Sequence, residues 1–113
     1  MTQSLFLARD DVARARLAQS AVAYAFGVSQ DDLEAPTRRS REAAFARQVA
    51  MYLAHIAFEL SLTRVAQAFG RDRSTAAHAC HRIEDQRDDR GFDASMDALE
   101  ACLRAAPQPG DPA

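Results

Sequence analysis

Residues 61–83 read SLTRVAQAFGRDRSTAAHACHRI, and this stretch carries the clearest structural signals of the sequence. Its first half predicts a short helix, because Ser61 is a favoured N-cap residue and Gly70 is a favoured helix stop. Between them, apolar side chains recur at the spacing of one helical face. These side chains are Leu62, Val65, Ala66 and Phe69.

The second half predicts another helix, over 74–87, after a turn at 71–73. Asp72 or Ser74 is expected to cap it. Its inward side chains are mostly small, which allows the two helices to pack closely; they are Ala76, Ala79, Cys80 and Ile83. A short capped helix, a tight turn with glycine and a second helix form a helix-turn-helix pattern.

Upstream of this motif the sequence is also helical in its periodicity. A helix is predicted over 10–26, with Gly27 as its stop. Ser29 and Asp32 are spaced as in a capping box, which predicts one short helix ending near Leu33.

The strongest helical pattern runs from about residue 43 to residue 60. A last amphipathic helix carries Phe92, Met96, Leu99 and Leu103, and no segment has the alternation of a strand. The sequence therefore predicts an all-α fold: a compact helical domain with a central helix-turn-helix and about five to six helices.

The length of 113 residues allows one domain with a modest core. We expect residues 1–9 to be an N-terminal extension, residues 10–105 to form the domain, and residues 106–113 to be a disordered tail. There is no signal-peptide pattern, and no apolar stretch approaches the ~20 residues of a membrane span. Two cysteines 22 positions apart suggest neither a disulfide framework nor zinc, so a cytoplasmic protein is expected.

The charges are distributed unevenly along the chain. Residues 36–82 hold eight Arg and three acids, a balance of +5, whereas residues 83–113 hold three Arg and eight acids, a balance of −5. Residues 1–35 carry −2. A basic middle between acidic flanks is typical of a local site for a polyanion.

Metal binding and catalysis find little support in the residues. His78 and Cys80 would point about 200° apart on a helix, and a zinc site needs converging ligands. We therefore predict that Cys80 is a small core residue and that His78 and His81 lie on the surface. The four glycines form no phosphate-binding loop, and no catalytic triad signature occurs, so neither an enzyme nor a cofactor is predicted.

Anion binding fits the residues better. The start of the 74–87 helix offers backbone N–H groups together with Ser74 and Thr75, and Arg71 and Arg73 flank it. His78 and Arg82 follow Thr75 at helical spacing, so one face of this helix is polar and basic. The segment RRSR (38–41) and the pair Arg47-Gln48 add a second cationic cluster, which could reach an adjacent minor groove.

The stretch RQVAMYLAHIAFELSLTRVAQAFGRDRSTAAHACHRIED (47–85) resembles the C-terminal DNA-binding domain of the bacterial replication initiator DnaA. That family has Arg-Gln before an Ala- and Met-rich helix, then Ser-Leu, Phe-Gly and an Arg-Asp-His-Thr-Thr turn. It closes with His-Ala-Cys and a basic residue before Ile. The resemblance continues upstream through RRSR and covers about residues 10–104.

The resemblance implies a role for each matched residue. Arg39 matches a basic-loop arginine that enters the minor groove, and Asp72, Arg73 and Ser74 lie where the family reads base edges. The residues that match positions contacting phosphates or the nearby backbone are Arg47, Gln48, Thr75, His78 and Arg82. The complete predicted interface is Arg38, Arg39, Arg41, Arg47, Gln48, Thr63, Arg71, Asp72, Arg73, Ser74, Thr75, His78 and Arg82.

The sequence departs from the family at the residues that read bases. Only Gly70 stands where the family has two glycines, and Arg73 replaces the base-reading histidine. Thr63 replaces a proline, and Ala76-Ala77 replaces a bulky pair. We therefore expect DNA binding to be retained with an altered sequence preference.

These observations predict a bacterial, nucleoid-associated protein that binds double-stranded DNA sequence-specifically as a monomer. It is expected to regulate transcription as an activator and to lack the initiator's ATPase module. RNA polymerase or a sigma-factor-like protein is the expected partner, as in the stand-alone alphaproteobacterial regulators of gene-transfer-agent clusters that this domain resembles. Two alternatives stay open: a replication regulator that competes for initiator boxes, and a protein-interaction module that has lost DNA binding and uses the acidic segment 84–100.

Overall fold

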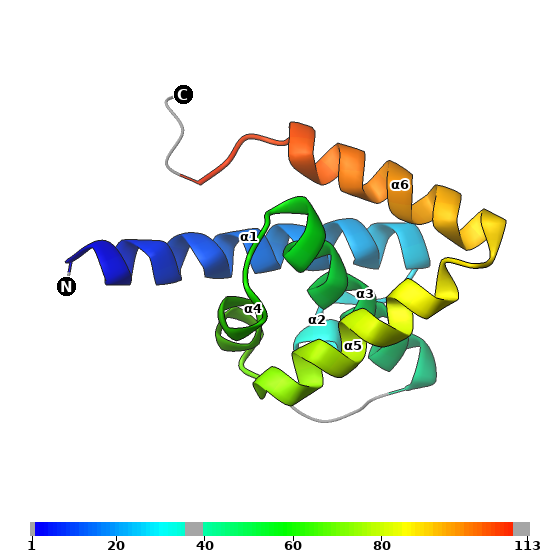
Figure 1. Cartoon of the computed structure of the whole chain (residues 1–113), viewed down its shortest axis with the longest axis horizontal. Coiled ribbons are helices and arrows are strands. Elements are labelled where there is room, and N and C mark those ends of the chain that lie inside the picture. Colours follow the sequence, from blue (N-terminus) through cyan, green and yellow to red (C-terminus); the bar gives the residue numbers. More distant parts are fainter. Residues whose placement is uncertain (1, 36–39, 110–113) are drawn as a thin grey trace.

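The computed structural model describes residues 2–35 and 40–109, with the side chains of the first helix described from Leu7 onward. That part of the chain folds into six helices without a strand (Figure 1), which confirms the predicted all-α class. The helices are α1 Thr2–Phe26, α2 Gln30–Glu34, α3 Arg41–Ala57, α4 Leu62–Phe69, α5 Arg73–Gln86 and α6 Arg90–Ala105.

Helix α1 is longer than the sequence pattern indicated. It begins at Thr2 instead of near residue 10, because no glycine or proline interrupts the chain before Gly27. Gly27 has a φ of 65°, a left-handed conformation that ends the helix as expected. Residues 2–9, expected to be an extension of the domain, belong to α1, whose N-terminal part projects beyond the other helices (Figure 1).

Helix α3 lies two to three residues earlier than predicted. Ser40 caps its start, and the Ser40 Oγ accepts a hydrogen bond from the Ala43 N–H over 3.0 Å. The helix ends at Ala57, since Glu59 adopts a left-handed φ of 56° that breaks the helical path.

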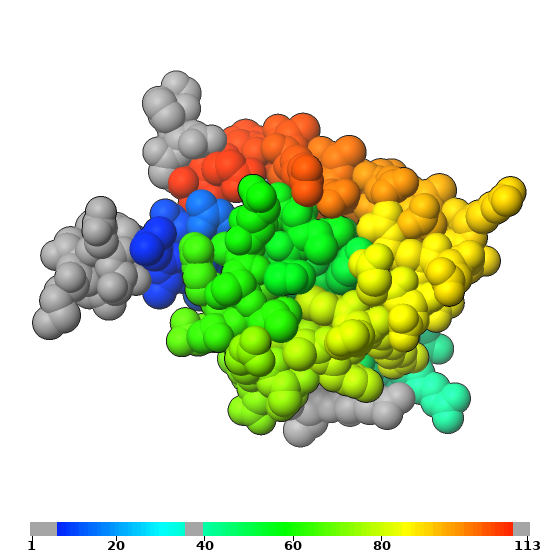
Figure 2. Space-filling view, viewed as in Figure 1, coloured from blue at the N-terminus to red at the C-terminus, as the bar shows by residue number. Residues whose placement is uncertain are grey.

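The core is built around α3, which packs against each of the other five helices. Ten of its residues are buried. The largest fully buried side chains of the domain come from all six helices except the first half of α1: Val22, Leu33, Val49, Met51, Leu53, Val65, Ile83, Met96 and Leu103. This arrangement leaves α4 and α5 at one surface of the molecule, with α6 along its edge (Figure 2).

The predicted helix-turn-helix is formed by α4 and α5. Gly70, with a φ of 65°, ends α4, and the Arg71 N–H closes the turn by donating to the Ala66 carbonyl over 2.9 Å. Helix α5 begins at Arg73 with Asp72 as its N-cap residue, one position earlier than expected. Ala76 and Ala79 are fully buried, so the small inward side chains do bring α5 close to its neighbours.

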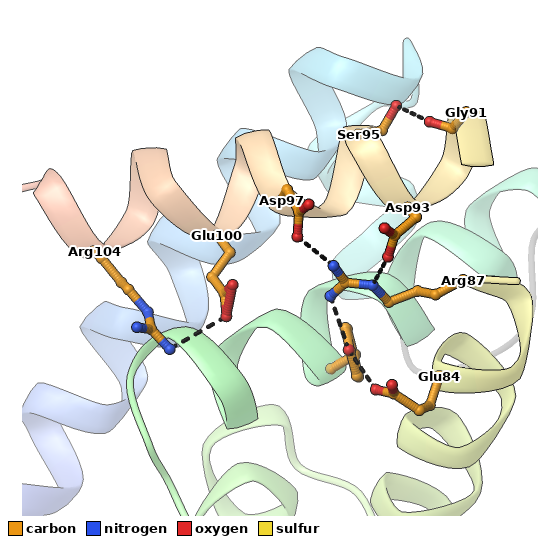
Figure 3. Close-up of polar contacts among 9 residues, drawn as sticks. Glu84, Arg87, Gly91, Asp93, Ser95, Asp97, Glu100 and Arg104 are labelled. Atoms are coloured by element: carbon orange, nitrogen blue, oxygen red, sulfur yellow. Dashed lines mark hydrogen bonds and ion pairs between the residues drawn. The ribbon is translucent and has the colours of Figure 1, made fainter. Parts of the chain in front are cut away.

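Helix α6 is fixed to the end of α5 by Arg87 (Figure 3). The Arg87 guanidinium forms ion pairs with Asp93 and Asp97 on α6 and donates to the Tyr52 hydroxyl on α3 over 3.1 Å. The Tyr52 hydroxyl in turn donates to a Glu84 carboxylate oxygen on α5 over 2.6 Å. One connected set of polar side chains therefore joins α3, α5 and α6.

The two surface histidines are placed as predicted, whereas Cys80 packs against the core without being fully buried. His78 and His81 are exposed, and Cys80 is half-buried, where burial above all raises the pKa of its thiol to about 11. Across residues 2–35 and 40–109, no three His, Cys, Asp or Glu side chains gather where they could hold a metal ion. Among the same residues, no helix has the length and apolar character needed to cross a bilayer.

Candidate nucleic-acid interface

A groove of about 540 Å³ runs between α3 and α5. The described residues that line it are mostly basic and polar, with two small or apolar side chains among them, and they include no acid. The lining residues are Arg41, Ala44, Arg47, Gln48 and Met51 from α3, Arg71 from the turn, and Thr75, His78 and Arg82 from α5.

One wall of the groove is a single face of α5. Thr75, His78 and Arg82 are all exposed and follow each other at intervals of three and four residues. Residues at this spacing lie one above another on a helix. The structure therefore brings these three predicted residues together, opposite the N-terminal half of α3.

Arg82 is held in place before any ligand binds. Its Nη1 donates to the Gln48 Oε1 on α3 over 2.8 Å, and its guanidinium lies 5.3 Å from the centre of the Phe45 ring. Phe45 itself packs against the rings of Phe26 and Phe92. A cation stacked on a supported aromatic ring loses little side-chain freedom when it binds an anion.

Arg47 has a structural role that the sequence did not predict. Only 8% of this residue is exposed, and its Nε and Nη2 donate to the carbonyls of Leu33 and Asp32 over 2.9 and 3.0 Å. Burial, followed by the nearby charge of Arg71, lowers its pKa. The guanidinium thus supplies hydrogen-bond donors to the carbonyls at the C-terminal end of α2, and it also lines the groove. The predicted contact with phosphate is therefore at most part of its role.

Arg71 makes a parallel contact from the helix-turn-helix turn. Its Nη2 donates to the Ala35 carbonyl over 2.8 Å, and its side chain also lines the groove. Arg71 and Arg47 thus both donate hydrogen bonds to backbone carbonyls that lie just before the basic segment RRSR (38–41). Within that segment, the predicted residues Arg38 and Arg39 lie outside the described residues, whereas Arg41 is exposed at the mouth of the groove.

The residues predicted to read bases lie at the start of α5, between two groove residues. Asp72, Arg73 and Ser74 are exposed, preceded in the chain by Arg71 and followed by Thr75. Although Asp72 is the N-cap residue, its carboxylate makes no capping hydrogen bond to the first turn. The carboxylate is therefore not engaged by the helix that it begins.

Thr63 is the one described residue of the predicted site that lies apart from the others. It is exposed on α4 and is not among the residues lining the groove. Conversely, Ala44 and Met51 line the groove and the Phe45 ring lies beneath Arg82, and none of these three was predicted from the sequence. A signal for the burial of Arg47 was present, because it follows Ala43 by four residues and so continues a stripe of alanines, namely Ala43, Ala50 and Ala54.

Comparison with known proteins agrees with this geometry. The profile of the family described as "Bacterial dnaA protein helix-turn-helix" matches residues 15–83. The chromosomal replication initiator DnaA of Symbiobacterium thermophilum is 38% identical over 86 residues, which cover 74% of this chain and 19% of that protein. The DnaA of Rippkaea orientalis is 46% identical over 63 residues, which cover 55% of this chain and 14% of that protein.

Solved structures give the same result. A crystal structure of a DNA replication initiation factor matches with a TM-score of 0.74 and 27% identity, over 85% of this chain and 30% of that one. A replication initiator DnaA bound to AMPPCP and single-stranded DNA matches with a TM-score of 0.73 and 27% identity, over 85% and 29% of the two chains. The chain spans less than a third of each relative and holds the same helical domain, and it therefore belongs to the bacterial DnaA helix-turn-helix family of DNA-binding domains.

Proposed function

We propose that this chain binds double-stranded DNA at specific sequences and regulates transcription as an activator. The observation that carries the proposal is the groove between α3 and α5, which four arginines line. Membership of a DNA-binding family supports the DNA-binding part of the proposal. The proposed role is binding, with no chemical step.

The proposed mechanism divides the contacts into two classes. Arg41, Arg82, Thr75 and His78 contact phosphates and fix the register of the domain on the duplex. Asp72, Arg73 and Ser74 enter the major groove and select the sequence, with the Asp72 carboxylate suited to accept from a cytosine amino group. In this arrangement the N-terminal end of α5, which is the positive end of its helix dipole, also faces the DNA backbone.

Activation requires a protein partner, and we propose RNA polymerase or a sigma-factor-like protein. With DNA in the groove, α6 and the corner between α5 and α6 stay accessible. That corner carries the exposed acids Asp85, Asp88 and Asp89. We propose that one monomer occupies each site, since one groove and one α5 reading end suffice for recognition.

Selection from randomised duplexes, followed by affinity measurements at several salt concentrations, tests the DNA-binding proposal. We expect one enriched motif and an affinity that falls steeply with salt, with a log–log slope of several units. A flat salt response without an enriched motif would identify the domain as a protein-interaction module instead. A promoter fusion carrying the enriched motif then tests activation.

A second candidate function is regulation of replication by competition for initiator boxes. The identity of the relatives favours it, because both initiators named above are chromosomal replication proteins. Binding to an ordinary initiator box, measured beside the selected motif, separates the two candidates. Equal or tighter binding to the initiator box would favour the replication role.

A further inference from the structure

A buried carboxylate on α1 holds the first helix of the helix-turn-helix. Asp11 is 6% exposed, and Arg64 on α4 donates to both of its oxygens, from Nε to Oδ2 and from Nη2 to Oδ1, each over 2.8 Å. Arg14 adds a third N–H donor to Oδ1 over 3.1 Å. Two-pronged bonds between guanidinium and carboxylate fix direction as well as distance. Arg64 belongs to the basic stretch 36–82, yet it bonds to α1 and does not line the groove.

Apart from this ion pair, helix α4 is held by the packing of a few apolar side chains. It is eight residues long, and only Val65 and Ala66 are buried. Towards its C-terminal end, a pocket of about 190 Å³ opens beside α1, lined among others by Val12, Ala15, Ala68 and Phe69. Packing between the two helices is therefore incomplete at that end, and the ion pair fixes the other end.

The angle of α4 matters for recognition because only Gly70, Arg71 and Asp72 separate it from α5. Because this short turn is closed by backbone hydrogen bonds, a rotation of α4 also rotates the first turn of α5. That first turn carries Arg73 and Ser74. Displacements of about 1 Å at a recognition element are enough to weaken hydrogen bonds to base edges.

We propose that Asp11 is a positioning residue for sequence recognition, which acts by setting the angle of α4 through Arg64. This role rests on the proposed DNA binding. It predicts that losing the pair lowers the preference for the correct sequence even in fully folded protein. A residue that only stabilised the fold would lower the melting temperature and leave that preference unchanged.

The test compares Asp11→Asn, Arg64→Gln and the double variant with the wild type. Each is measured with the selected duplex and with a scrambled duplex, at a temperature where circular dichroism shows the variant to be fully folded. The two single changes alter the net charge in opposite directions, so a purely electrostatic effect would move their affinities oppositely. Asp10→Asn removes the same charge from the neighbouring position and is the matched control.

We expect both single variants to lose about tenfold in the ratio of selected to scrambled affinity, the scale of one charge-assisted hydrogen-bond pair. The double variant should be no worse than either single variant, because the two residues act through one contact. Asp10→Asn should keep the wild-type ratio. An unchanged ratio in folded Asp11→Asn protein would overturn the positioning role and leave DNA binding intact, whereas a wild type that binds no duplex would overturn the proposed function itself.

Discussion

Arg82 on α5 and Gln48 on α3 face each other across the groove, joined by a hydrogen bond of 2.8 Å from the Arg82 Nη1 to the Gln48 Oε1. This contact presents a cation at a fixed position, and we expect it to meet a phosphate. Arg82→Ala should therefore weaken binding to all duplexes alike and lower the log–log salt slope by about one. Arg90→Ala, an exposed arginine on α6 that does not line the groove, is the matched control and should leave the slope unchanged.

Arg47→Lys tests the structural role of the buried guanidinium. A lysine keeps the charge but cannot donate to the Leu33 and Asp32 carbonyls in the same forked geometry. We expect the free energy of unfolding to fall by about 1–3 kcal/mol, measured by urea denaturation without DNA. Arg41→Lys, at the exposed start of α3, should leave stability unchanged. Equal stability of both variants would show that the α2 contact contributes nothing.

Arg73→Ala tests base selection. A planar guanidinium most often pairs with the O6 and N7 atoms of guanine, whereas the resemblance implies that the family's histidine at this position approaches a thymine methyl. The preferred site should therefore hold guanine in place of that thymine. The variant should lose about 1–3 kcal/mol at that site and discriminate less at one base pair only. Arg73→His should move the preference back towards thymine. A uniform loss across all sequences would instead assign Arg73 to a phosphate.

Phe69→Ala tests the packing of the motif. The Phe69 ring is half-buried and packs against two groups of buried apolar side chains, one that includes Leu53 and one that includes Val65. Its removal should lower the free energy of unfolding by about 3 kcal/mol, and binding should be lost with the fold. Arg73→Ala should leave the thermal midpoint nearly unchanged. A Phe69→Ala protein that melts like the wild type would contradict this packing.

Tyr52 predicts a loss of stability at high pH. Burial, followed by the hydrogen bond to Glu84, raises the pKa of Tyr52 from 10.0 to about 12. Because the unfolded chain ionises first, stability is complete below pH 10 and falls as the pH rises towards 12, by up to about 2–3 kcal/mol. Thermal melts should show this fall, and Tyr52→Phe should abolish it. Both proteins should carry Cys80→Ala, since the raised pKa of Cys80 adds an earlier fall above pH 9.

Local signals in the sequence were enough to predict most of the fold. Cap residues and glycines gave the ends of the short helices, because Ser29, Ser61 and Gly70 act on the backbone within a few residues. The bounds of α3 were less accurate, since Glu59 takes a left-handed conformation that its residue type does not favour. The start of α1 had no cap or breaker to mark it.

The site was predictable where it follows one helix and unpredictable where it depends on tertiary contacts. Thr75, His78 and Arg82 share a face of α5 by spacing alone. By contrast, Arg64 looks like other surface arginines in the sequence, and the alanine stripe that indicates burial of Arg47 does not indicate its partners. Only the fold brings carbonyls of α2 to Arg47 and Asp11 to Arg64. The partners in these two contacts are separated by 14 and 53 positions in the chain, so no local pattern in the sequence signals the contacts.

The tyrosine that joins α3, α5 and α6 also gives the protein an optical reporter. The chain has two tyrosines and no tryptophan. Tyr24 is 83% exposed on α1, whereas Tyr52 is 3% exposed and bonded to both Glu84 and Arg87. The tyrosine band of the near-ultraviolet circular dichroism spectrum should therefore come mainly from the one immobilised tyrosine ring, and it reports without any label whether these three helices are docked.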